Sequence, residues 1–208
     1  MKIVQIPFSD YIAEEHPKTQ IYLHHTAGTG NGDQVYKWWA ADKTKVATCV
    51  IIDRDGTIKQ GFNSKFWAYH LGLGNAHFAA KKVTYRNLDK TSIGIEIIGW
   101  GWVTKKDGKY FTYVNSEVKA EDVITLDKPF KGFIHWHKYT QAQIDAVVDL
   151  LKLWKERYNI DISYNEDIWD VTPRALRGEG GVFTHCSVRP DKFDVFPQPE
   201  LIEALKAL

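Results

Sequence analysis

Three apolar segments that lie far apart along the chain each carry a polar side chain able to bind a metal or transfer a proton. Residues 21–25 end in two histidines, residues 92–98 enclose Glu96, and residues 182–185 end in His185. Short apolar runs of this kind are typical of buried strands. Ligands at the ends of such strands are held by a rigid sheet, so the pattern favours an enzyme built around a metal ion.

The order of the remaining patterns predicts a single α/β domain over residues 1–208, with a central mixed sheet flanked by helices. Thr140 and Gln143 match a capping box, and apolar residues follow them at helical spacing. In chain order the predicted elements are a strand over 21–25, a helix capped by Asp33 and ending near 42, strands over 46–52 and 57–60 joined by a turn, a strand over 91–100, a hairpin around 107–108, a helix over 140–158, a strand over 182–185 and a helix over 200–208.

The charge balance and the apolar runs exclude several classes of partner. The formal net charge is +1, so no strong field favours nucleic acid or an acidic membrane surface. No stretch approaches the roughly 20 apolar residues of a membrane-spanning helix, and residues 1–7 lack the apolar segment of a secretory signal. We therefore expect a cytoplasmic protein, and we expect it to be a monomer.

Aromatic residues and cysteines add two further expectations. The chain has 8 Trp, 10 Tyr and 10 Phe, more than a core of this size needs, so some rings should line a groove, with Trp67 and Trp100 as the candidates for its wall. The only cysteines are Cys49 and Cys186. We expect two reduced thiols, because two cysteines do not form a disulfide framework; a single bridge between them is the alternative.

The candidate site residues have the chemistry of a zinc hydrolase. His24, His185 and Asp194 offer two imidazoles and a carboxylate, a set that leaves the fourth position of tetrahedral zinc open to water. Burial would raise the pKa of Glu96 towards the range of a useful proton carrier. Lys192 precedes Asp194 by two positions, so its cation could stabilise an oxyanion that develops near the metal.

Five short motifs in a fixed order make the reading more specific. They are His24 followed by Thr26-Ala27, then Arg54-Asp55-Gly56, Ala68-Tyr69-His70, Ser92 to Glu96, and His185 followed by Lys192-Phe193-Asp194. Together they resemble the type 2 family of zinc-dependent N-acetylmuramoyl-L-alanine amidases, which includes phage lysozymes of amidase type and is similar to peptidoglycan recognition proteins. Each motif alone would be weak evidence, but five in order span most of the chain.

The resemblance implies a reaction and a role for each residue of the set. His24, His185 and Asp194 would bind one zinc ion, and the enzyme would cut the amide between the lactyl group of muramic acid and L-alanine in peptidoglycan. In the same family pattern, the remaining residues would act on the substrate: Glu96 by activating water and passing its proton to the leaving amine, Lys192 by stabilising the oxyanion, and His70 by contacting the muramyl-peptide.

Several residues have simpler alternatives. Neighbouring strand residues face opposite sides, so only one of His24 and His25 can point at the metal, and the family register favours His24. By the same argument Cys186 points away from the metal site into the core. His135 and His137 share a strand face and could hold a second metal, although an exposed aromatic hairpin is the simpler interpretation. Three further aromatic residues are expected to be core residues on helices: Trp38, Trp39 and Trp154.

The chain also departs from the family pattern. Thr48-Cys49 stands where the family often has Tyr or Ala followed by His, and Val195 replaces a common Pro. Residues 101–139 exceed the minimal family domain and are interpreted as an insertion, which would either reshape the groove or bind another component of the wall.

Three functions follow from these observations. The leading one is a zinc amidase, acting as a phage endolysin, a virion-associated enzyme or a cytoplasmic enzyme of wall recycling. The second is a non-catalytic peptidoglycan-binding protein on the same fold, which the complete ligand set argues against. The third is a zinc hydrolase of another substrate, such as a peptidase, but the chain lacks the His-Glu-x-x-His motif of many metallopeptidases.

Overall fold

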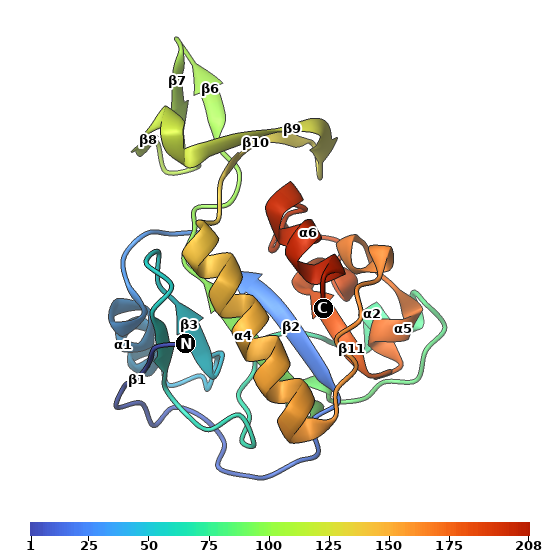
Figure 1. Ribbon diagram of the computed structural model, residues 1–208. Coiled ribbons are helices and arrows are strands. Elements are labelled where there is room, and N and C mark those ends of the chain that lie inside the picture. Colours follow the sequence, from blue (N-terminus) through green and yellow to red (C-terminus); the bar gives the residue numbers. More distant parts are fainter.

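The computed structural model describes residues 1–208 and has a six-stranded mixed sheet at its centre (Figure 1). Across the sheet, its strands are β1 (Ile3–Gln5), β4 (Ile58–Gln60), β3 (Val50–Ile52), β5 (Ser92–Ile97), β2 (Gln20–His25) and β11 (Gly181–Thr184). The four strands β3, β5, β2 and β11 run parallel, and β4 returns antiparallel to β3 as a hairpin. The carboxyl ends of four strands therefore meet at one edge of the sheet.

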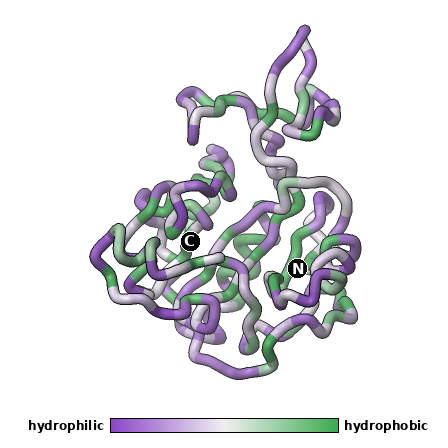
Figure 2. Tube along the Cα trace, turned by 180° about the vertical axis from the view of Figure 1, so that it is seen from behind, coloured by the Kyte–Doolittle hydropathy of each residue, from purple (hydrophilic) through white to green (hydrophobic).

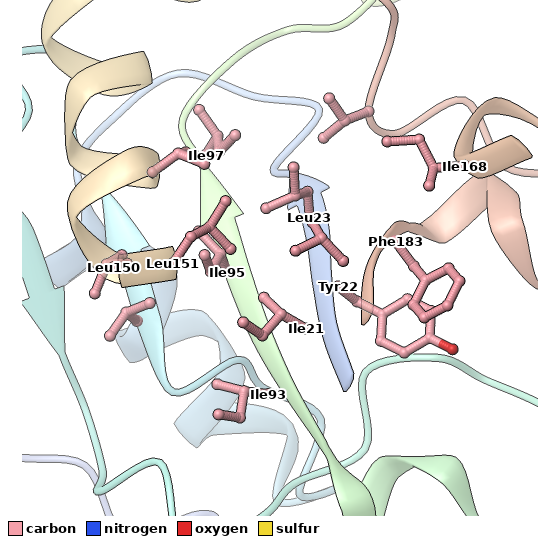
Figure 3. Close-up of a cluster of buried hydrophobic side chains, with 14 of the residues drawn as sticks. Ile21, Tyr22, Leu23, Ile93, Ile95, Ile97, Leu150, Leu151, Ile168 and Phe183 are labelled. Carbon is pink, nitrogen blue, oxygen red and sulfur yellow. The ribbon is translucent and has the colours of Figure 1, made fainter. Parts of the chain in front are cut away.

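The central strands β2 and β5 are buried along their whole length because both faces of the sheet are covered. One face presents aliphatic side chains, and Leu150 and Leu151 of helix α4 (Gln141–Tyr158) lie against it (Figure 3). On the other face Tyr22 stacks on Phe183 of β11, with ring centroids 5.5 Å apart. Each fully buried aliphatic side chain of this core stabilises the fold by about 1.5–3 kcal/mol.

Helices cover both faces of the sheet. The helices other than α4 are α1 (Gly32–Asp42), α2 (Asn75–Ala79), α3 (Leu88–Thr91), α5 (Pro173–Leu176) and α6 (Pro199–Lys206). Helix α4 lies along one face with α6 beside it, whereas Tyr36 of α1 packs with Ile51 on the opposite face (Figure 1). None of the helices combines the length and the apolar character needed to cross a bilayer.

The segment after β5 forms two small sheets outside the central one. The first contains β6 (Thr104–Lys106), β7 (Lys109–Phe111) and β8 (Glu117–Val118); the second is a ribbon of β9 (Val123–Phe130) and β10 (Phe133–His137). Both project from one end of the molecule, and the tip of the β6–β7 hairpin is hydrophilic (Figures 1 and 2). The base of the projection is anchored by Trp136, which is fully buried and stacks on Phe196 at 4.7 Å.

Most predicted elements are confirmed, and the exceptions have local causes. The α/β class, the β3–β4 hairpin and α4 with its Thr140–Gln143 capping box are present. Strand β3 is shorter than the predicted 46–52, and the N-cap of α1 is Asn31, whose side chain accepts from the backbone of Gln34, so Asp33 lies in the first turn instead. The strand β1, the short helix α2 and the ribbon β9–β10 were not predicted. Both cysteines are free thiols, as expected, and buried.

Candidate active site

Three side chains meet at the carboxyl edge of the sheet. His24 is the penultimate residue of β2, His185 follows β11 directly, and Asp194 comes from the loop beyond it. The Nδ1 atoms of the two histidines are 3.1 Å apart, and Asp194 Oδ2 lies 3.1 Å from Nδ1 of His24 and 3.0 Å from Nδ1 of His185. Ligands of a tetrahedral zinc ion at about 2.0–2.2 Å lie roughly 3.3–3.6 Å from one another. The triangle is therefore close to the size that one zinc ion needs.

The outer nitrogens of both imidazoles bind protein groups, which leaves the Nδ1 atoms facing the carboxylate. Nε2 of His185 lies 3.0 Å from the backbone oxygen of Leu71. Because a carbonyl oxygen only accepts, Nε2 carries a hydrogen, and Nδ1 is the ring nitrogen that faces the cluster. Nε2 of His24 also has a protein partner, Nδ1 of His70, at 2.9 Å. Metal-binding histidines are commonly oriented by such outer partners, so the donor set fits a zinc ion.

His70 is itself held on both sides. Its Nε2 lies 2.8 Å from Ser92 Oγ, its backbone N–H donates to Asp89 Oδ1 at 2.9 Å, and its side chain is only 5% exposed. A Cβ atom at Gly94 would lie 3.2 Å from His70 Nδ1 and 2.6 Å from Cγ2 of Thr48. The glycine in the strand motif thus makes room for this ring. With both nitrogens bonded to protein, His70 is placed to orient His24.

The electrostatics of the cluster suit a bound cation. Burial, reinforced by the neighbouring His185, lowers the pKa of His24 to about 4. Burial alone would raise the pKa of Asp194, but hydrogen bonds from His185 and His24 outweigh it and hold that pKa well below the ordinary value. At neutral pH the cluster therefore offers a neutral His24 imidazole and an ionised carboxylate, the forms that ligate zinc.

Glu96 and Lys192 line a cavity of about 350 Å³ together with the three clustered side chains. Glu96 is 8% exposed, and burial, with the added repulsion of Asp194, raises its carboxyl pKa well above the ordinary value while Lys192 lowers it. A carboxyl group with a raised pKa can both accept and return a proton near neutral pH.

Trp38 and Trp67 lie differently from the sequence-based expectations, whereas Trp154 is buried on α4 as expected. Trp38, expected in the core, is 61% exposed and extends from α1 to line the cavity that contains the clustered side chains. Trp67, expected on the groove wall, is 5% exposed, donates its indole N–H to Glu14 and lies outside the cavity with the clustered side chains. Trp100 lines a second cavity next to the cluster. Periodicity counts every tryptophan as apolar, so it cannot distinguish a core ring from a groove ring.

The other candidate ligands lie elsewhere. His25 points to the opposite side, where its Nδ1 lies 2.9 Å from the hydroxyl of Tyr139. Cys186 is fully buried, with its thiol near the backbone oxygen of Lys192. In the projecting ribbon, His135 Nδ1 bonds Thr125, and His137 accepts from the backbone of Trp100. His24, His185 and Asp194 form the one group of three such side chains close enough to share an ion.

The chain matches one protein family and shares its fold with several solved structures. A family model described as N-acetylmuramoyl-L-alanine amidase matches residues 14–194. The structure of PlyL superposes with a TM-score of 0.57 at 15% identity, covering 99% of this chain and 98% of PlyL. The amidase LysC from Clostridium intestinale URNW gives 0.53 at 14% identity, with 100% and 96% covered. AmiD from E. coli, solved with the substrate anhydro-N-acetylmuramic acid-L-Ala-D-γ-Glu-L-Lys, gives 0.50 at 20% identity, with 92% and 59% covered. No curated protein sequence matches the chain.

Proposed function

This chain belongs to the N-acetylmuramoyl-L-alanine amidase family, whose members hydrolyse an amide bond of peptidoglycan, and we propose that it does so as a zinc enzyme with His24, His185 and Asp194 as the metal ligands. The observation that carries the proposal is the triangle of Nδ1, Nδ1 and Oδ2 atoms with sides of 3.0–3.1 Å. Zinc in such a site would polarise the scissile carbonyl and lower the pKa of water to about 7.

In the proposed mechanism Glu96 moves the proton. Its buried carboxyl lines the same cavity as the three clustered side chains and is paired in register with His24 across β2 and β5. It would take a proton from the attacking water and return it to the nitrogen of the leaving alanine. The raised pKa of Glu96 suits both steps, because the group must hold the proton between them.

Lys192 would stabilise the charge that develops on the carbonyl oxygen. Its side chain lines the cavity two residues before Asp194 and is half-buried. A cation in a partly desolvated site stabilises an oxyanion more than the neutral carbonyl that precedes it, which lowers the barrier to attack. His70 would act by fixing the ring of His24, through the 2.9 Å contact between them.

The proposed scissile bond is the amide between the lactyl group of N-acetylmuramic acid and L-alanine. The supporting likeness is to amidases, including AmiD with its muramyl-peptide. The test is to incubate purified peptidoglycan with the protein and measure new amino-terminal alanine and new sugar reducing ends, with and without a zinc chelator. We expect alanine to appear only without chelator and reducing ends not to appear. Alanine release that persists after complete metal removal would contradict the zinc assignment.

We also propose that the enzyme acts on intact wall, as a lysis enzyme. The supporting observation is the likeness, over almost the full chain, to the endolysin LysCS from Clostridium intestinale URNW, with a TM-score of 0.53 at 14% identity. A lysis enzyme should release alanine from intact sacculi at a rate comparable to its rate on soluble muramyl-peptides. A recycling enzyme should cleave the soluble fragments and leave sacculi almost untouched, and that result would overturn the proposed role.

A further inference from the structure

A second cavity lies beside the cluster, and the proposed chemistry does not use it. Its volume is about 220 Å³, and its aromatic lining consists of Trp100, Trp102, Tyr113 and Phe193. We infer that this aromatic cavity is a subsite for a sugar ring of the glycan strand, supplied largely by the segment that follows β5. The inference rests on the proposed function, because it concerns the substrate of the same site.

The aromatic cavity adjoins the catalytic one. Both are lined by Lys192 and Asp194, and both reach Ala27 in the loop after β2. The amide to be cut has a sugar on its acyl side and a peptide on its amine side. A group bound in the aromatic cavity while the amide lies at the cluster must therefore be the sugar or the first part of the peptide.

The rings of this cavity are held in place, which a binding wall requires. Trp102 stacks on Phe133 of β10 with centroids 4.2 Å apart and planes 9° from parallel. Tyr113 lies edge-on to Trp100 at 6.1 Å, and its hydroxyl donates to the backbone oxygen of Ala27 at 2.9 Å. That hydrogen bond ties the projecting segment to the loop beside the cluster. These side chains lose their conformational freedom when the protein folds, so binding a ligand costs little further conformational entropy.

The chemistry of the lining favours a sugar over a peptide. A pyranose ring has apolar C–H faces and a rim of hydroxyl groups, so it needs a flat aromatic wall with polar groups at its edge. The wall here includes Tyr113, which is 52% exposed, and charged side chains of Asp191 and Lys192 stand at the same cavity. Pockets that enclose a drug-sized ligand measure roughly 300–1,000 Å³. A cavity of about 220 Å³ suits one ring at a time.

The opposite end of the catalytic cavity has a different lining, which leaves it for the peptide. There Trp38 and Val46 stand 61% and 43% exposed, Trp39 lies beside them as a second lining ring, and Thr48 lies deeper. The two linings thus differ in their share of rings: the aromatic cavity has four of them, whereas the part of the catalytic cavity beside α1 combines two tryptophans with small side chains of the segment before β3. This difference assigns the sugar to the aromatic cavity.

The test compares two substrates that share one peptide. The first is N-acetylmuramoyl-L-alanyl-D-isoglutamine, and the second is the corresponding lactoyl dipeptide, which lacks the sugar ring. For wild type and variants, kcat/KM is measured on both. We expect Trp100→Ala and Tyr113→Ala to lower the ratio of sugar-bearing to sugar-free kcat/KM about tenfold, mainly through KM on the first substrate. Trp100→Phe should recover most of the ratio, because it restores an aromatic face.

The control is Tyr85→Ala, which removes a half-exposed aromatic ring that packs on Phe78 outside both cavities. Its ratio should equal that of the wild type. A Trp100→Ala ratio equal to wild type, or an equal loss on both substrates, overturns the sugar subsite. Should Trp100→Ala fail to fold, Tyr113→Ala carries the test from an exposed position. A wild type that cleaves neither substrate contradicts the proposed function itself, and this inference with it.

Discussion

His24 and Glu96 are direct partners across the parallel strands β2 and β5. Paired residues of neighbouring strands project to the same face of a sheet, so the candidate ligand and the candidate proton carrier share one face. Their separation is fixed by the backbone ladder, and His25 is turned to the other face by the same geometry. The relationship leads directly to the first two predictions.

Replacing the Glu96 carboxyl by an amide should separate metal binding from catalysis. Glu96→Gln keeps the shape of the side chain but cannot carry the proton, so we expect full zinc content and a loss of about 10²–10⁴ in kcat. Zinc per chain by atomic absorption and alanine release from peptidoglycan check the two parts. Wild-type activity in this variant would remove Glu96 from the mechanism.

Adjacent histidines should differ in their effect on metal content. His24→Ala removes one corner of the ligand triangle, whereas His25→Ala removes only a hydrogen bond to Tyr139. We expect purified His24→Ala to hold little zinc and His25→Ala to hold about one ion per chain. Zinc retained in His24→Ala and lost in His25→Ala would show that His25, not His24, faces the metal site.

Loss of the His70 ring should weaken metal binding as well as activity. Because the ring orients His24 through Nε2, we expect His70→Ala to lower zinc affinity about 10- to 100-fold, measured by competition with a chromophoric chelator. Ser92→Ala, which removes only the outer partner of His70, should have a smaller effect in the same direction. Unchanged zinc affinity with a raised KM would instead indicate direct contact between His70 and the substrate.

The metal-free protein should lose stability between pH 6.5 and 4, in part because of His137. Burial, reinforced by Arg54, lowers the pKa of His137 to about 4, below the roughly 6.5 of an unfolded chain. As the pH falls, the unfolded state takes up the proton first, so the stability present above pH 6.5 declines towards pH 4.

Denaturant unfolding with chelator present tests this contribution. The unfolding free energy of the wild type should fall between pH 7 and pH 5. In His137→Gln this fall should be about 2 kcal/mol smaller. Parallel curves for the two proteins would mean that His137 keeps its unfolded pKa in the native state.

Sequence patterns predicted the parts of this molecule that obey a simple period. Strands β2 and β5 are apolar along their length because both of their faces are covered, and α4 has both a capping box and an apolar face. The ribbon β9–β10 was missed because much of it is solvent-exposed and its composition is mixed, so its pairing depends on the partner strand rather than on its own pattern.

The candidate site was predictable where side-chain chemistry is distinctive and less so where it depends on packing. His24 and His185 stood out as ligand types at strand ends, with the Asp194 carboxylate following in the next loop, and the structure brings the three together. The contacts from His70 to Ser92 and from Asp89 to the backbone of His70 join segments with no shared pattern. Only the fold reveals that these residues support one another.

The triangle of candidate ligands has a mechanical consequence as well as a chemical one. His24 and Asp194 are 170 positions apart, so an ion that binds both would close most of the polypeptide into a ring. Such an ion adds about 2.7 kcal/mol of stability when its free concentration is a hundred times its Kd. The availability of zinc would then affect how fast proteases degrade the protein. The metal-free protein would unfold more often and would therefore be degraded sooner.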